Sequence, residues 1–190
     1  MLELHYAAAG AGAALVALPT HLVASELMHI LVDSEPSVVF AAARFANLIR
    51  ETGELLGDAR LEMPPVVWIV DPSARSSPPI FGGTLYESAV DLGAGLWRSG
   101  SSVLSPGRGD DPLHLYYTSG TAGQPTGVVL SHGMVLAHAA GVAAAMRLGA
   151  GDVWGHFAPV RGGAYAHRIP PLFFGHCSYA YVRKPRMYVC

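Results

Sequence analysis

Residues that could do chemistry are concentrated in one stretch, Tyr116–Gly133, which reads YYTSGTAGQPTGVVLSHG. Within it, four hydroxyl side chains and three glycines fall between Thr118 and Gly127. Glycines permit unusual backbone conformations that expose successive N–H groups, and such groups form concavities that bind anions, above all phosphate. Serine and threonine hydroxyls can donate further hydrogen bonds to phosphate oxygens. The stretch therefore predicts a phosphate-binding loop.

The elements on either side must hold this loop in place. An apolar run, Leu113–Tyr117, precedes it and a second run, Val128–Leu130, follows it, so both flanks are predicted to be strands. Ser131 is the predicted N-cap of a helix over residues 132–148, because serine is favoured at that position. The apolar face of this helix would include Val135, Ala139, Val142 and Met146. The predicted order is strand, loop, strand, helix.

This order excludes two common nucleotide-binding motifs. The dinucleotide fingerprint G-x-G-x-x-G requires a helix to begin at the loop, whereas a strand is predicted here. The P-loop G-x-x-x-x-G-K-[ST] requires a second glycine five residues after the first, and Pro125 occupies that place after Gly120.

Helical and strand-like segments alternate through the first part of the chain, which is typical of α/β folds with mostly parallel strands. The strand over residues 66–70 is uninterrupted and rich in β-branched residues, as expected when both faces are buried. Asp33–Pro36 is predicted to end the second helix. Helices are predicted over residues 1–14, 24–32 (with Ser25 as a cap) and 41–56, and strands over 14–18, 37–40 and 66–70.

The segments around the loop-bearing stretch are predicted to be less regular. Pro72–Gly83 is expected to be a loop, and Thr84–Leu92 a short helix that opens with Glu87. Gly93–Gly109 is expected to be an exposed linker anchored by Trp97. Residues 149–151 would end the long helix after Ser131, and residues 152–160 carry one more apolar run.

Composition limits the classes of function. The formal net charge is −2, which gives no support for a nucleic-acid or anionic-membrane partner. With only Cys177 and Cys190, neither a disulfide framework nor a cysteine zinc site is predicted. The nine histidines form no H-E-x-x-H pattern, so no metal site made by protein side chains alone is expected, and His132 is interpreted as a helix-start residue. No signal peptide or membrane span is predicted; the expected compartment is the cytoplasm, with an organelle as the alternative.

The end of the chain differs in character from the rest. No aspartate or glutamate follows Asp152, and both helical and strand periodicity fade from Arg161 onward. We therefore expect a main part over residues 1–160 and a divergent, irregular tail over residues 161–190. The alternative for the tail is a foreign end produced by a splice, reading-frame or truncation artefact in the gene.

Residues 117–132 resemble the signature of the adenylate-forming (AMP-binding) superfamily, which includes acyl-CoA synthetases, luciferases and peptide-synthetase adenylation domains. That signature is an aromatic residue followed by T-S-G-[ST]-T-G-x-P-K-G-V and a later S-H or T-H pair before a helix; here it reads YTSGTAGQPTGV, then Ser131-His132. Residues 5–40 and the segment GDVWGHFAPV are similar to further parts of the acyl-CoA synthetase branch. The resemblance covers most of residues 5–160 and implies an α/β fold, an incomplete part of the family's large N-terminal domain.

The resemblance implies a carboxylate-activating ligase. In such enzymes the loop grips the β- and γ-phosphates of ATP while a carboxylate attacks the α-phosphate, and coenzyme A then takes the acyl group. Mg²⁺ and hydrogen-bond donors neutralise the leaving pyrophosphate. The implied ligands are ATP, Mg²⁺, coenzyme A and a small-molecule carboxylate. The implied nucleotide-binding residues are Thr118, Ser119, Gly120, Thr121, Gly123, Thr126 and Gly127, and no catalytic residue is assigned.

Two positions in the loop depart from the family pattern. The second threonine is Ala122 and the lysine is Thr126, so one hydroxyl donor and one cation are lost. Losing a hydrogen bond to a charged group costs about 1.5–3 kcal/mol. The family's Pro-x-[FY]-His element would fall near Val160–Gly163, which reads VRGG, and no counterpart of its adenine, ribose and catalytic-lysine elements is found. We therefore expect a ligase fragment that is inactive as this chain; the alternative is a non-catalytic nucleotide-binding or interaction remnant.

Overall fold

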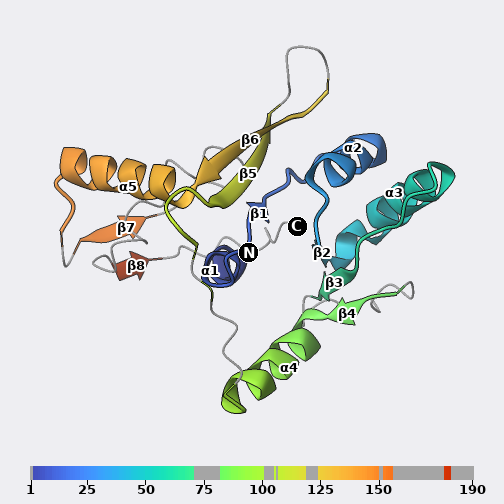
Figure 1. Cartoon of the computed structure of the whole chain (residues 1–190), viewed down its shortest axis with the longest axis horizontal. Helices are drawn as coiled ribbons and strands as arrows, with labels where there is room; N and C mark the ends of the chain where they lie inside the picture. Colours follow the sequence, from blue (N-terminus) through green and yellow to red (C-terminus); the bar gives the residue numbers. More distant parts are fainter. Residues whose placement is uncertain are drawn as a thin grey trace. The chain divides into compact units, whose positions relative to one another are not determined.

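The computed structural model describes residues 2–70, 82–100, 105, 107–118, 124–149, 152–155 and 178–180. Helices alternate with mostly parallel strands, which confirms the predicted α/β class (Figure 1). The chain divides into two compact units, which we describe separately. Unit 1 contains residues 1–18, 104–118 and 127–188, and unit 2 contains residues 19–103, 119–126 and 189–190.

The main sheet of unit 1 has the strand order β1-β5-β6, so β5 is central (Figure 1). β1 runs parallel to β5, with Leu15 opposite His114. The connection from β5 to β6 is too short for a parallel crossover, which takes about a dozen residues or more, so these two strands form an antiparallel hairpin. The elements are α1 (Leu2–Gly10), β1 (Leu15–Val16), β5 (Pro112–Thr118), β6 (Thr126–Ser131), α5 (His132–Met146), β7 (Val153–Gly155) and β8 (Ser178–Ala180).

Helix α5 begins as predicted and ends earlier than predicted. The Ser131 hydroxyl accepts the backbone N–H of Met134 at 3.3 Å, which confirms the N-cap. Arg147 adopts a left-handed conformation (φ 53°) and the Leu148 N–H donates to the Ala143 carbonyl at 2.9 Å, so the predicted ending at residues 149–151 is wrong. Val135 and Ala139 are buried as expected, but Met146 is 53% exposed. Because α5 is apolar on all sides, its periodicity could not mark the buried face.

The sheet of unit 2 has the order β2-β3-β4 with all strands parallel, and Val39 lies opposite Val66. Helices α2 and α3 pack side by side (Figure 1). The core side chains of these helices are Leu27, Ile30 and Leu31 of α2 and Ile49, Thr52 and Leu56 of α3. The elements are α2 (Ala24–Ser34), β2 (Val39–Ala42), a short 3-10 helix η1 (Ala43–Phe45), α3 (Ala46–Asp58), β3 (Val66–Ile69), β4 (Thr84–Leu85) and α4 (Tyr86–Arg98).

Two helix starts in unit 2 differ from the sequence expectation. Helix α2 starts after Val23 rather than at the predicted cap Ser25, and the Glu26 carboxylate accepts the Val23 N–H at 3.1 Å. Glutamate at the third helical position commonly supplies this reciprocal capping bond. Helix α3 starts only at Ala46, because β2 continues to Ala42 and η1 follows it. The predicted end of α2 is confirmed by Glu35, which is left-handed with φ 41°.

The predicted boundary between a short helix at Thr84–Leu92 and a linker at Gly93–Gly109 is wrong. Thr84 and Leu85 form β4, and the following helix continues to Arg98. Gly93 and Gly95 sit inside this helix with nothing close to either, so their cost of about 1 kcal/mol each relative to alanine is tolerated. Trp97 is 60% exposed, so it is not the buried anchor that was predicted. The predicted loop at residues 72–81 lies outside the described residues.

The tail is not irregular throughout. Residues 178–180 form β8, which pairs in parallel with β7, with Ser178 opposite Val153. The expectation of an irregular segment is therefore wrong for these three residues. The remainder of 161–190 lies outside the described residues.

Candidate functional site

The predicted phosphate loop lies between β5 and β6 and is followed by α5, which is the predicted order of strand, loop, strand and helix. Thr118 is the exposed last residue of β5, and Thr126 is the exposed first residue of β6. Thr126 and Gly127 are thus strand residues and not loop residues. The central predicted contacts, Ser119, Gly120, Thr121 and Gly123, lie outside the described residues and remain predictions.

Gly127 is required by close packing rather than by an unusual dihedral angle. Gly127 does not have a positive φ angle. A Cβ atom at this position would lie 3.1 Å from Leu115 Cδ1 and 3.3 Å from Tyr117 Cε1, both on β5. These distances are tighter than ordinary van der Waals contact, so a side chain here would require the Leu115 and Tyr117 side chains to shift by a few tenths of an ångström.

One contact to the end of the loop comes from a residue 96 positions earlier. His29, on α2, places its Nε2 atom 3.2 Å from the carbonyl oxygen of Pro125. Both residues belong to unit 2. A carbonyl oxygen only accepts, so the His29 Nε2 atom must carry the proton and donate it. No sequence pattern around His29 distinguishes it, so this contact was not predicted from the sequence.

A buried cluster of aromatic and imidazole rings lies in unit 1. His5 of α1 stacks edge-on against His114 of β5 with ring centroids 5.1 Å apart, and His114 lies 5.5 Å from the Tyr116 ring. All three residues are at least 94% buried, since their exposed fractions are 6%, 3% and 3%. His114 and Tyr116 were predicted to lie in an apolar strand, but their ring contacts were not predicted. The sequence signal that could have indicated a buried histidine is the presence of His114 within an apolar run.

The electrostatics of the cluster keep it neutral. Burial lowers the pKa of His5 to about 3, with His114 and the N-terminus adding smaller effects of the same sign. Burial, together with His132, lowers the pKa of His114 to about 4. Burial raises the pKa of the Tyr116 phenol to about 12. General acid–base catalysts work best with a pKa near the operating pH, so these groups are unsuited to proton transfer near pH 7.

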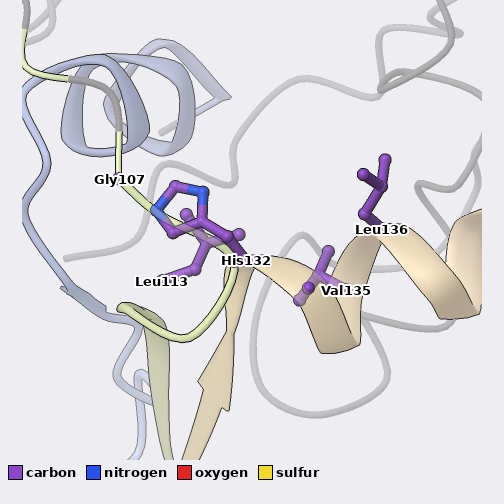
Figure 2. A pocket seen from close by; sticks show the side chains of 7 residues that line it. Gly107, Leu113, His132, Val135 and Leu136 are labelled. Atoms are coloured by element: carbon purple, nitrogen blue, oxygen red, sulfur yellow. The ribbon is translucent and has the colours of Figure 1, made fainter.

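His132 lines a pocket of about 250 Å³ in unit 1 (Figure 2). Its imidazole lies against Gly107, where a Cβ atom would come within 2.4 Å of Nε2. The pocket is lined by Gly107, Gly109, Leu113, His132, Gly133, Val135 and Leu136. None of the described residues that line it is a carboxylate, a lysine or an arginine, so these residues do not suit a polyphosphate. The position of His132 as the first residue of α5 confirms its interpretation as a helix-start residue.

Within the described residues, no three His, Cys, Asp or Glu side chains come together as a possible metal site. No helix in this part of the chain combines the length and the apolar character needed to cross a membrane.

Comparison with known proteins identifies the relatives of the chain. It is 31% identical over 132 residues to a peroxisomal butyrate–CoA ligase of Arabidopsis thaliana. The matched region covers 70% of this chain and 23% of that protein. It is 34% identical over 136 residues to a peroxisomal benzoate–CoA ligase of the same plant, again covering 70% and 23%. The chain thus spans about a quarter of the length of these relatives.

Solved structures share the fold. An acyl-CoA synthetase from Brucella canis aligns with a TM-score of 0.68 at 22% identity, covering 94% of this chain and 31% of the other. ATP-bound MatB from Rhodopseudomonas palustris aligns with a TM-score of 0.66 at 24% identity, covering 95% and 32%. The sequence profile of the AMP-binding enzyme family matches residues 1–184, well beyond residue 160, where the resemblance was expected to end. The chain belongs to the AMP-binding enzyme family.

Proposed function

We propose that the chain supplies the nucleotide-phosphate grip of an ATP-dependent acid–thiol ligase of the acyl-CoA synthetase type. The observation that carries this proposal is the arrangement of β5, loop, β6 and α5 in a chain of the AMP-binding family, with Thr118 and Thr126 at the two ends of the loop. Threonine hydroxyls are suitable donors for phosphate oxygens. By family analogy, Ser119, Gly120, Thr121 and Gly123 would complete the grip, with Gly127 closing the hairpin behind it.

The residues present suit a polyphosphate better than they suit a bare metal ion. No aspartate or glutamate lies between Leu113 and Ser131, so this stretch offers no carboxylate to Mg²⁺. A magnesium ion here would be held mainly by the phosphate oxygens, as is usual for Mg²⁺ with nucleotides. When bound, the ion would offset the charge on the leaving pyrophosphate. The part left to this chain is to bind and orient the phosphates.

The finer parts of the proposal concern substrates and activity. The relatives are named as butyrate–CoA and benzoate–CoA ligases, so a small carboxylate and coenzyme A are the proposed co-substrates. We propose that these 190 residues alone do not complete the reaction, because Thr126 and Ala122 replace the family's lysine and threonine. A loop without this cation would bind ATP weakly, since a hydrogen bond to a charged group is worth about 1.5–3 kcal/mol.

Restoring the lysine tests the proposal. Thr126→Lys should tighten binding of MgATP and of pyrophosphate by about tenfold or more, as measured by titration calorimetry. Thr84→Lys is the matched control, because Thr84 is also an exposed threonine that opens a strand. An equal gain in both variants would show a general charge effect and contradict the assignment of the loop.

Turnover is tested separately by ATP–pyrophosphate exchange with a panel of fatty and aromatic acids. We expect no acid-dependent exchange by the 190-residue chain. Exchange that depends on one acid would overturn the proposed inactivity and would also identify the substrate. Binding without exchange would match the non-catalytic alternative.

A further inference from the structure

The contact between His29 and Pro125 has a role that the family signature does not contain. We propose that His29 is a positioning residue for the phosphate loop: its Nε2–H holds the Pro125 carbonyl and so orients the Pro125–Thr126 peptide at the start of β6. The inference rests on the proposed function, because it assigns His29 to the same loop. It identifies a residue of α2, outside the signature stretch, that prepares the loop for a polyphosphate.

His29 is carried by a helix whose backbone is held in place. It lies on α2 between Leu27 and Ile30, which are 3% and 1% exposed, and α2 packs against α3. The helix is held at its start by the Glu26 capping bond and stopped at its end by the left-handed Glu35. The backbone that carries the His29 side chain is therefore held in place at both ends of the helix and by its buried face.

The acceptor of the His29 hydrogen bond is the carbonyl oxygen of Pro125. Proline has no N–H, so the backbone of Pro125 can be held only through its carbonyl. The peptide group is planar, so fixing the Pro125 carbonyl also fixes the plane of the Thr126 N–H, which points the opposite way in a trans peptide. The structure contains no cis peptide bond among the described residues. His29 therefore sets how the chain enters β6.

The Pro125–Thr126 peptide lies within the stretch that resembles the adenylate-forming signature. Thr126 stands where the family has its lysine, and it is the exposed first residue of β6. A change in the Pro125–Thr126 peptide plane would move the backbone that presents residue 126 to a ligand. Small misplacements of a binding group reduce its contribution strongly, because hydrogen bonds weaken steeply with distance and angle. The His29 contact therefore bears on the residue with the largest expected influence on phosphate affinity.

The test compares His29→Leu, which removes the donor, with His29→Gln, which keeps an N–H donor without the ring. His29→Leu should weaken binding of MgATP and pyrophosphate by about three- to tenfold, the usual loss for one neutral hydrogen bond. His29→Gln should restore most of that loss. His21→Leu is the matched control, because His21 is an exposed histidine of the same unit. Equal affinity in His29→Leu and the wild type overturns the inference.

A second readout needs no nucleotide. Amide hydrogen exchange over residues 124–127 should be faster in His29→Leu and near the wild-type rate in His29→Gln. If the wild type binds neither ligand but this exchange pattern holds, the proposed function fails and the positioning role stands. Unchanged exchange in His29→Leu overturns the positioning role whatever the affinity. If His29→Leu does not fold, His29→Met provides the same loss of a donor with a flexible side chain.

The two residues are also expected to be coupled. The gain in affinity from Thr126→Lys should be smaller in the His29→Leu background than in the wild type, because the peptide that aims residue 126 is no longer held. Double-mutant cycles measure such coupling directly. Equal gains in both backgrounds contradict the inference.

Discussion

In unit 2 the most deeply buried polar side chain is Thr52, whose hydroxyl donates to the Leu48 carbonyl at 2.8 Å. Among the described residues of unit 1, the buried polar side chains are the rings of His5, His114 and Tyr116. Within the described part of the chain, no hydrogen-bond partner is found for Nδ1 of His114, the Tyr116 hydroxyl or Nε2 of His132. An unsatisfied buried group costs about 1–3 kcal/mol.

The difference shows that the two units respond to different conditions. Among the described residues of unit 2, the buried core consists of aliphatic side chains, Trp68 and the satisfied hydroxyl of Thr52, none of which is an acid or a base near neutral pH. Unit 1 buries His5 and His114, which must stay neutral to remain buried. We therefore expect low pH, the substitution of Gly107 and the removal of buried hydroxyl groups to change the stability of the two units to different extents.

The largest expected effect is acid destabilisation of unit 1. The pKa values of His5 and His114 are lowered to about 3 and about 4, so between these values and about 6.5 the unfolded chain binds more protons than the folded one. The free energy of unfolding must then fall as pH drops below about 6.5, by a total on the order of 8 kcal/mol for the two groups, since their pKa values differ by about 3.5 and about 2.5 between the two states and each pKa unit is worth about 1.4 kcal/mol. The loss should stop once pH falls below the folded pKa values. Urea titrations at several pH values, followed by NMR signals of α5 and α3, would measure each unit.

The control for the acid experiment removes the titrating groups. A His5→Leu/His114→Leu double variant should lose much of the pH dependence of unit 1, and His21→Leu should keep it. A double variant with an undiminished pH dependence would show that other groups are responsible. A unit 2 that loses as much stability as unit 1 would remove the contrast.

An intermediate effect is expected at Gly107. Gly107→Ala should destabilise unit 1 by roughly 1–3 kcal/mol, because the new Cβ atom would meet the His132 ring at 2.4 Å and overpacking has costs of this size. Gly109→Ala is the matched control, since nothing lies near its Cβ position. Thermal unfolding would measure both. Equal losses in the two variants would place the cost in the backbone and not in the contact with His132.

The smallest effects should have opposite signs in the two units. Thr52→Val removes a satisfied bond in unit 2 and should cost about 1 kcal/mol, whereas Tyr116→Phe removes a hydroxyl without a described partner and should be neutral or slightly stabilising. Chemical denaturation resolves differences of this size. A clear destabilisation by Tyr116→Phe would reveal a partner for the phenol and would reduce the contrast between the units.

The signature stretch shows how far the sequence could predict this molecule. Strand, loop, strand and helix around residues 113–146 were predicted in the correct order, because apolar runs, glycines and the Ser131 cap are local signals. The end of α5 was missed because Arg147 takes a left-handed conformation that is usual for glycine. Helix α4 was missed in part because Gly93 and Gly95 resemble linker residues when no packing is considered.

Contacts between distant residues could not be predicted in the same way. His114 was assigned to a strand, but its stacking on His5 depends on how α1 reaches β5. His29 carries no local signal, because its partner Pro125 lies about half the chain away. Local patterns therefore predicted the order of elements around the proposed phosphate loop, whereas contacts such as that of His29 with Pro125 required the folded structure.

The separation between His29 and Pro125 also bears on the order of events during folding. Helix α2 and its partner α3 are close in sequence, so they can pair soon after both have been synthesised. The bond to Pro125 spans 96 residues, and the entropy of closing so long a segment must be offset before the bond gains anything. The entry to β6 would therefore be fixed late, after the helices are in place. On the ribosome, the bond between His29 and Pro125 could form only after residue 125 has left the exit tunnel, so a newly made chain would pass through a state with a folded α2–α3 pair and no bond to Pro125.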